Sequence, residues 1–173
     1  MVKTLLIGYK SGIGASIYNN IPNIKGESLS TGFDINKRII YDYSEFDTII
    51  INAYSDFGSQ LRLLYDIIET INKKTLVIVI ASISAYRTNQ KDISKSKYTN
   101  EKAAIIHAGR DLNELGYNVS IISPGITDTR WNKNKDCMKL KTDDISKIIM
   151  SAIDNYYNFN ILTEHLVMRF KND

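Results

Sequence analysis

Tyr98 and Lys102 are the residues in this sequence whose types and spacing best suit proton transfer. They are four positions apart in a segment that predicts a helix, so their side chains share one face. An ammonium group beside a phenol favours the phenolate and lowers the tyrosine pKa from about 10. Such a tyrosine can exchange a proton with a carbinol oxygen near neutral pH. The pair alone is a weak signal, because a solvated helix face produces the same spacing.

A glycine-rich segment, Gly8-Tyr9-Lys10-Ser11-Gly12-Ile13-Gly14, lies between an apolar run and an apolar helical pattern. A helix that begins there offers unpaired N–H groups and the positive end of its dipole to an anion. Glycines also allow a tight turn and let phosphates approach the backbone. A plain strand-to-helix turn is the alternative interpretation. The position after a first buried strand favours a dinucleotide-binding turn, with its contacts made by Gly8, Lys10, Ser11, Gly12, Ile13 and Gly14.

Apolar runs alternate with helical patterns along the chain, and these elements would position the turn and the pair. Strands are predicted at residues 4–8, 27–30, 47–53, 75–81, 119–122 and 161–168. Helices are predicted at 13–21, 61–71, 98–115 and 145–153. This alternation predicts the α/β class, with a single Rossmann-type doubly wound parallel sheet flanked by helices. A length of 173 residues without a linker predicts one domain over 1–173.

Composition argues against several classes of function. The formal net charge of +3 is too small to predict binding to nucleic acid or to an acidic membrane surface. No apolar run is long enough to span a bilayer. Cys137 is the sole cysteine, so no intrachain disulfide can form and the cytoplasm is the expected compartment. His107 and His165 lie far apart in sequence, and we therefore expect no metal site.

Five motifs in this order resemble those of the short-chain dehydrogenase/reductase family. The glycine turn resembles the cofactor turn of that family, and Ile51-Asn52-Ala53-Tyr54 resembles its Asn-Asn-Ala-Gly motif, with Tyr54 in place of the glycine. Ala81-Ser82-Ile83-Ser84-Ala85 resembles the catalytic serine segment, and Tyr98-x-x-x-Lys102 the catalytic pair. Ser123-Pro124-Gly125-Ile126-Thr127-Asp128-Thr129 resembles the Pro-Gly-x-x-x-Thr motif. The resemblance covers about residues 3–168 and implies an unusually short member, a single NAD(P)-binding Rossmann domain.

The resemblance implies a role for each matched residue. Tyr98 would be the general acid/base, Lys102 would bind the nicotinamide ribose and lower the tyrosine pKa, and Ser82 would polarise a substrate carbonyl. The implied activity is an NAD(P)(H)-dependent interconversion of a small-molecule carbonyl and an alcohol. The remaining cofactor contacts would come from the end of the second strand, the Asp-Ile step, the Asn-Ala step and the Pro-Gly segment: Ser30, Asp34, Ile35, Asn52, Ala53, Pro124, Ile126 and Thr129.

Two catalytic positions depart from the family pattern. Ser82 is further from Tyr98 than is usual in the family, and Ser84 is nearer to the usual spacing; the alignment with the strand end favours Ser82. The active-site asparagine of the family has no clear match, and Gln60 and Asp56 are the nearby polar candidates.

The end of the second strand bears on the choice of cofactor. A carboxylate there binds the ribose 2′-hydroxyl of NAD. The predicted end reads Ser28-Leu29-Ser30-Thr31, without an acid, and Lys10 can approach a 2′-phosphate. We therefore expect NADP(H) in preference to NAD(H), with Asp34 as the counter-argument if the strand ends later.

The chain is short in two places where the family is longer. Between Gly14 and Asn52 there is room for only a stunted helix, and the segment between Thr129 and Asp143 is short and polar. A small lid predicts an open site and a weakly held or bulky substrate, or one supplied by a partner. Small residues in the helix of Tyr98, and the family pattern, imply a homodimer or homotetramer. A non-catalytic NADP(H)-binding regulator or scaffold on the same fold is the alternative function.

Overall fold

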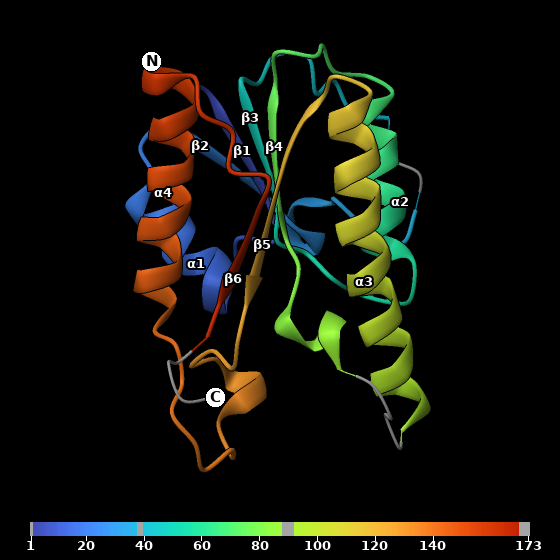
Figure 1. Cartoon of the computed structure of the whole chain (residues 1–173), viewed down its shortest axis with the longest axis vertical. Coiled ribbons are helices and arrows are strands. Elements are labelled where there is room, and N and C mark those ends of the chain that lie inside the picture. Colours follow the sequence, from blue (N-terminus) through green and yellow to red (C-terminus); the bar gives the residue numbers. More distant parts are fainter. Residues whose placement is uncertain (1, 38–39, 88–91, 170–173) are drawn as a thin grey trace.

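Six parallel strands form one sheet in the order β2-β1-β3-β4-β5-β6 (Figure 1). The structure is a computed structural model, and it describes residues 2–37, 40–87 and 92–169. The strands are β1 (Thr4–Ile7), β2 (Ile24–Glu27), β3 (Thr48–Ile51), β4 (Leu76–Ile80), β5 (Asn118–Pro124) and β6 (His165–Met168). The predicted α/β class and the parallel, helix-flanked sheet are confirmed.

Strand register determines which residues meet at the carboxyl edge of the sheet. Ile7 of β1 pairs with Glu27 on one side and with Ile51 on the other, and Ile51 in turn pairs with Val79. The chain passes from β1 to β2 and then back across β1 to β3, so the strand order reverses at β1 and β3. Ligands of open α/β sheets bind at such a switch point, outside the carboxyl ends of the strands.

The α-helices of the described residues cover both faces of the sheet (Figure 1). They are α1 (Gly12–Asn20), α2 (Ser59–Ile68), α3 (Ile93–Glu114) and α4 (Thr142–Phe159). The helices α1 and α4 pack on one face, where Ile17 and Ile149 join the apolar side chains of the strands. The helices α2 and α3 pack on the other, through Leu64 and Ile105 among others. None of the helices in the described part of the chain is long and apolar enough to cross a membrane.

An irregular segment covers the α2 side of the sheet, where only a stunted helix was predicted. We call residues 33–37 and 40–47 the aromatic strap. Its aromatic side chains Phe33, Tyr43 and Phe46 are almost fully buried and pack in the same core cluster as α2. Before it, the described chain forms a single 3-10 turn, η1 (Leu29–Thr31). Burial of aromatic rings, rather than a helix, therefore closes this side of the core.

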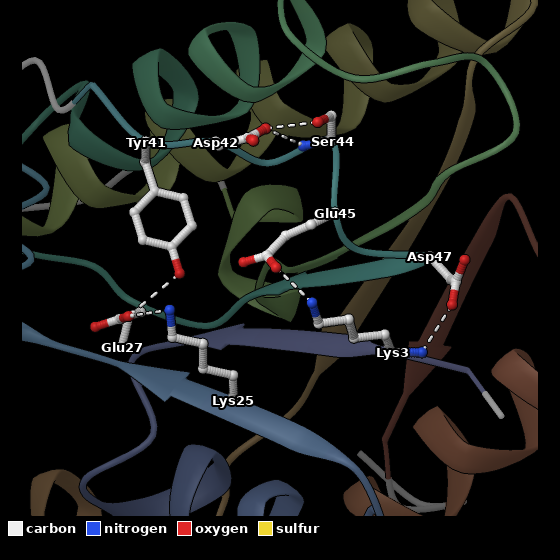
Figure 2. Close-up of polar contacts among 8 residues, drawn as sticks. All are labelled: Lys3, Lys25, Glu27, Tyr41, Asp42, Ser44, Glu45 and Asp47. Atoms are coloured by element: carbon white, nitrogen blue, oxygen red, sulfur yellow. Dashed lines mark hydrogen bonds and ion pairs between the residues drawn. The ribbon is translucent and has the colours of Figure 1, made fainter.

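Polar contacts fasten the strap to β1 and β2 (Figure 2). The Lys3 ammonium pairs with Glu45, and the Lys3 backbone N–H donates to Asp47 Oδ2 at 2.8 Å. On the β2 side, the Tyr41 hydroxyl donates to Glu27 Oε1 at 3.2 Å. The strap is thus attached both near the start of β1 and at the end of β2.

Several predicted boundaries were wrong, including both ends of α4, which spans Thr142–Phe159 rather than 145–153. The second strand spans Ile24–Glu27 rather than 27–30, because Lys25 and Glu27 alternate with Gly26 on an edge strand that carries little apolar signal. Helix α3 begins at Ile93, where the Asp92 side chain caps it by accepting from the backbone N–H of Ser94 at 2.8 Å. The last strand begins at His165, four residues after the predicted start at Ile161.

Candidate active site

The glycine turn between β1 and α1 is closely packed against the chain that follows β3. A Cβ on Gly14 would lie 1.9 Å from the carbonyl oxygen of Gly8, and one on Gly8 would lie 2.6 Å from the backbone nitrogen of Ala53. Asn52 Nδ2 donates to the Gly8 carbonyl at 2.8 Å. Gly8 and Gly12 also have φ angles of +95° and +57°, which favour glycine. The turn therefore requires glycine at these positions on both steric and conformational grounds.

The first turn of α1 has the properties of an anion site. Its N-cap residue Ser11 makes no side-chain capping hydrogen bond, so it does not compete for the first helical N–H groups. Thr129 approaches from the loop after β5, and its Cγ2 would lie 3.1 Å from a Cβ on Gly12. The Lys10 ammonium lies 4.8 Å from the centre of the Tyr9 ring. The structure thus brings the glycine turn, Asn52, Ala53 and Thr129 together.

A carboxylate stands at the end of β2, where none was predicted. Glu27 accepts from Thr31 Oγ1 at 2.6 Å. It also pairs with the Lys25 ammonium at 3.3 Å, in addition to its contact with Tyr41 (Figure 2). Burial raises the pKa of Glu27, but these hydrogen bonds outweigh it and lower the pKa overall. Reading the second strand three residues earlier would have revealed this acid.

The other residues predicted on the adenine side lie around this corner. Ser30 is exposed, and its hydroxyl is 2.8 Å from that of Ser28. Asp34 accepts from the backbone N–H of Asn36 at 3.0 Å, and the Asn36 amide reaches Ser55 Oγ at 2.8 Å. Ile35 is buried in the core, so its side chain supports the strap. The Asp34–Asn36 segment therefore borders the loop that follows β3.

Ser82, Ser84 and Tyr98 form the polar group at the end of β4. Ser84 Oγ donates to Ser82 Oγ at 2.9 Å, and both hydroxyls lie close enough to Tyr98 to influence its pKa. Burial raises the pKa of Tyr98, and the Glu101 carboxylate adds to this, whereas the hydrogen bonds to Ser82 and Ser84 lower it. The pKa is raised overall, which is opposite to the lowering predicted from the Tyr98–Lys102 spacing.

The environment of Lys102 explains this difference. Its side chain is 2% exposed, and its ammonium donates to Gln60 Oε1 and, at 3.2 Å, to the carbonyl oxygen of Ile80. Burial lowers the pKa of Lys102 to about 7, with Glu101 opposing the shift. A lysine that is partly neutral near pH 7 stabilises a phenolate less than a fully charged one.

Gln60 is the side chain that holds Lys102. It is fully buried at the start of α2, and its Nε2 donates to the carbonyls of Ile51 and Ile80 at 3.1 and 3.2 Å. Of the two polar candidates for the missing asparagine, Gln60 is the one in contact with the lysine. Asp56 is exposed and accepts from the backbone N–H of Phe57 at 2.7 Å.

Glu101 is a buried carboxylate that the sequence analysis missed. It accepts from the backbone N–H groups of Gly58 and Gln60 at 2.8 and 2.9 Å, so it caps α2 from the neighbouring helix. A carboxylate at a helix N-terminus is stabilised by the free N–H groups and the dipole. No local pattern predicts it, because its partners lie more than forty residues away.

The loop after β5 carries the last predicted cofactor residues. Pro124 ends the strand and is buried, and Ile126 is half-buried. The Ile126 carbonyl accepts from the Leu140 N–H at 2.8 Å, which fixes this loop to the segment before α4. The short segment beyond Thr129 leaves Trp131 largely exposed.

Comparison with known proteins identifies the fold. No family model and no curated protein matches the sequence. A short-chain dehydrogenase from Burkholderia cenocepacia J2315, solved in complex with NADP, has a TM-score of 0.73 at 13% identity, over 97% of this chain and 88% of that chain. A small-chain dehydrogenase in complex with NADPH gives 0.70 at 19% identity, over 96% and 95%. The protein lin1944 from Listeria innocua gives 0.75 at 14% identity, over 98% and 100%. The resemblance seen in the sequence is thus confirmed at the level of the fold, and this chain has the fold of the short-chain dehydrogenases.

Proposed function

We propose that this protein is an NAD(P)(H)-dependent oxidoreductase that interconverts a carbonyl and an alcohol. The observation that carries the proposal is the group formed by Tyr98, Ser82 and Lys102 at the carboxyl ends of the strands. This group and the glycine turn lie at the same edge of the sheet. A dinucleotide bound at the turn would therefore lie next to a substrate bound beside Tyr98. Proton exchange by a tyrosine is chemistry that a carbonyl reduction requires.

The residues of the turn fit a dinucleotide. Gly14 and Gly8 leave no room for a side chain, and the uncapped first turn of α1 favours a pyrophosphate. Asn52 donates a hydrogen bond to the Gly8 carbonyl of the turn, and the Thr129 side chain lies close to Gly12. The nicotinamide, when bound, supplies or takes the hydride.

The roles of the chain's own residues follow from their contacts. Tyr98 donates the proton to the carbonyl oxygen during reduction and takes it back during oxidation. Ser82 polarises the same oxygen through its hydroxyl, and Ser84 orients Ser82 by donating to it. Gln60 accepts a hydrogen bond from the Lys102 ammonium and so positions it near the Tyr98 ring. We assign the supporting role to Ser84 because Ser82 is nearer to the end of β4 and Ser84 donates a hydrogen bond to it.

We favour NADP(H) over NAD(H). The two acids on this side of the site, Glu27 and Asp34, pair with Lys25 and Lys37, and Lys10 belongs to the glycine turn. A 2′-phosphate here would meet acids that are already paired and a further ammonium group, which is favourable. The Burkholderia enzyme and the small-chain dehydrogenase with this fold were solved with NADP and NADPH.

Glu27 limits this preference, because a carboxylate repels a 2′-phosphate and accepts from a 2′-hydroxyl. In Glu27→Gln the ratio of the NADH to the NADPH dissociation constant should rise about tenfold, a change of about 1.4 kcal/mol. Fluorescence titration with both cofactors measures the ratio. Glu45→Gln is the matched control, since Glu45 pairs with Lys3 near the start of β1 (Figure 2). An unchanged ratio in Glu27→Gln contradicts the assignment.

The activity itself is tested by mixing the protein with NADPH or NADH and a panel of ketones and aldehydes while the absorbance of the reduced cofactor is followed. We expect turnover on at least one carbonyl class. Tight binding without turnover on any of them favours the non-catalytic regulator. Failure to bind either nicotinamide contradicts both functions.

A further inference from the structure

Tyr54 stands where the Asn-Asn-Ala-Gly motif of the family has its glycine, so this position carries a large side chain. It directly follows Asn52 and Ala53, which contact the glycine turn. Its ring packs edge-on against the Tyr98 ring, with the centroids 4.9 Å apart and an interplanar angle of 87°. The side chain therefore lies between the proposed cofactor turn and the proposed catalytic tyrosine.

The same ring covers the ammonium of Lys102. Lys102 Nζ is 5.1 Å from the centre of the Tyr54 ring and 5.3 Å from that of Tyr98, which are cation–π distances. Tyr54 itself is 37% exposed, whereas Lys102 is 2% exposed. Two partly exposed rings, Tyr54 and Tyr98, thus lie against a buried cation, and Tyr54 is the one to which the proposed reaction assigns no role.

The donor count of the ammonium shows what the ring covers. A lysine ammonium has three N–H donors. Two of them have described acceptors, the Gln60 amide oxygen and the Ile80 carbonyl. The third has the two aromatic rings beside it. It is the donor that a ribose hydroxyl would need, and the Tyr54 ring already lies against it.

We propose that Tyr54 is a gate over Lys102, and that the nicotinamide ribose engages Lys102 only after the Tyr54 ring has moved aside. The proposal rests on the proposed function. The gate weakens cofactor binding, because the ring contacts with Tyr98 and Lys102 are lost when the ribose enters. It also keeps Lys102 buried, which agrees with its lowered pKa and with the raised pKa of Tyr98. Tyr54 is on this account a positioning residue that acts through Lys102.

The reactivity of the Lys102 amine tests, without any cofactor, whether the Tyr54 ring covers it. Reductive methylation with ¹³C-formaldehyde labels accessible lysines, and the Lys102 signal is assigned by comparing Tyr54→Ala with the double variant that also carries Lys102→Arg. We expect Lys102 to stay unlabelled in the wild type and in Tyr54→Phe, and to be labelled in Tyr54→Ala. Phe57→Ala removes another exposed ring of the same loop and should leave Lys102 unlabelled. Circular dichroism checks that each variant is folded.

Cofactor affinity tests the gate. The NADPH dissociation constant should fall about tenfold in Tyr54→Ala, the effect of losing an aromatic pair and a cation–π contact of ordinary strength. It should be unchanged in Tyr54→Phe and Phe57→Ala.

The proposal requires both results. Labelling of Lys102 in the wild type, or no labelling in Tyr54→Ala, contradicts the cover. An unchanged or weaker NADPH affinity in Tyr54→Ala overturns the gate while leaving the proposed function intact. If neither the wild type nor Tyr54→Ala binds a nicotinamide, the proposed function fails first and the gate fails with it.

Discussion

At the scale of single residues, the identity of the candidate catalytic group could be predicted from the sequence but its electrostatics could not. Tyr98, Ser82 and Lys102 were all found from their motifs, and the structure brings them together with Ser84. The direction of the Tyr98 pKa shift was wrong, because spacing along a helix says nothing about burial. Lys102 is enclosed by Gln60, Ile80 and two aromatic rings, and only tertiary structure supplies those neighbours.

The lowered pKa of Lys102 makes folding stability depend on pH. In the unfolded chain the group has its ordinary pKa of 10.5, and in the folded chain its pKa is about 7. Between these values the unfolded chain binds the proton and the folded chain does not, so the free energy of unfolding rises with pH across this window. The burial cost is present in full only below about pH 7.

Lys102→Met removes this contribution, so its free energy of unfolding should rise less between roughly pH 6.5 and pH 9.5 than that of the wild type. Urea unfolding at the two pH values measures the difference. Lys135→Met, at an exposed position, is the control and should keep the wild-type slope. Parallel behaviour of Lys102→Met and the wild type speaks against a buried, lowered-pKa lysine.

At the scale of elements, the sequence predicted the four α-helices and six strands of the described residues but misplaced several boundaries. Buried runs such as 75–81 were easy to find, because strands buried on both faces are continuously apolar. Strand β2 was misplaced because it lies at an edge and is largely polar, and this error hid Glu27. The start of α3 was missed because its first turns carry little apolar periodicity, and Asp92 provides the cap.

The contact of Glu101 with the start of α2 joins two elements, and its strength can be measured. In Glu101→Ala the N–H groups of Gly58 and Gln60 lose a buried acceptor, so the free energy of unfolding should fall by about 2 kcal/mol. Chemical denaturation gives this value directly. Glu114→Ala, at the exposed end of the same helix, should change stability by no more than about 0.5 kcal/mol. Equal losses in the two variants rule out the cap.

At the scale of the whole molecule, the aromatic strap stands where the short chain has no room for a full helix. The sequence predicted that the region between the second strand and residue 47 was too short for a full helix, but not what would replace it. Phe33, Tyr43 and Phe46 have no helical or strand periodicity, so their joint burial against α2 appears only in the structure. The strap packs on one face of the sheet, while the proposed cofactor site at its carboxyl edge contains the glycine turn, Asn52 and Thr129.

The most direct test of the whole account is the turnover number of Tyr98→Phe with NADPH and the best carbonyl substrate, alongside the cofactor dissociation constant. Phenylalanine keeps the ring that packs against Tyr54 and removes the hydroxyl that carries the proton. The account predicts that turnover falls by about a hundredfold or more while NADPH affinity changes little. Full turnover in Tyr98→Phe would contradict the central claim that Tyr98 is the proton donor of this oxidoreductase.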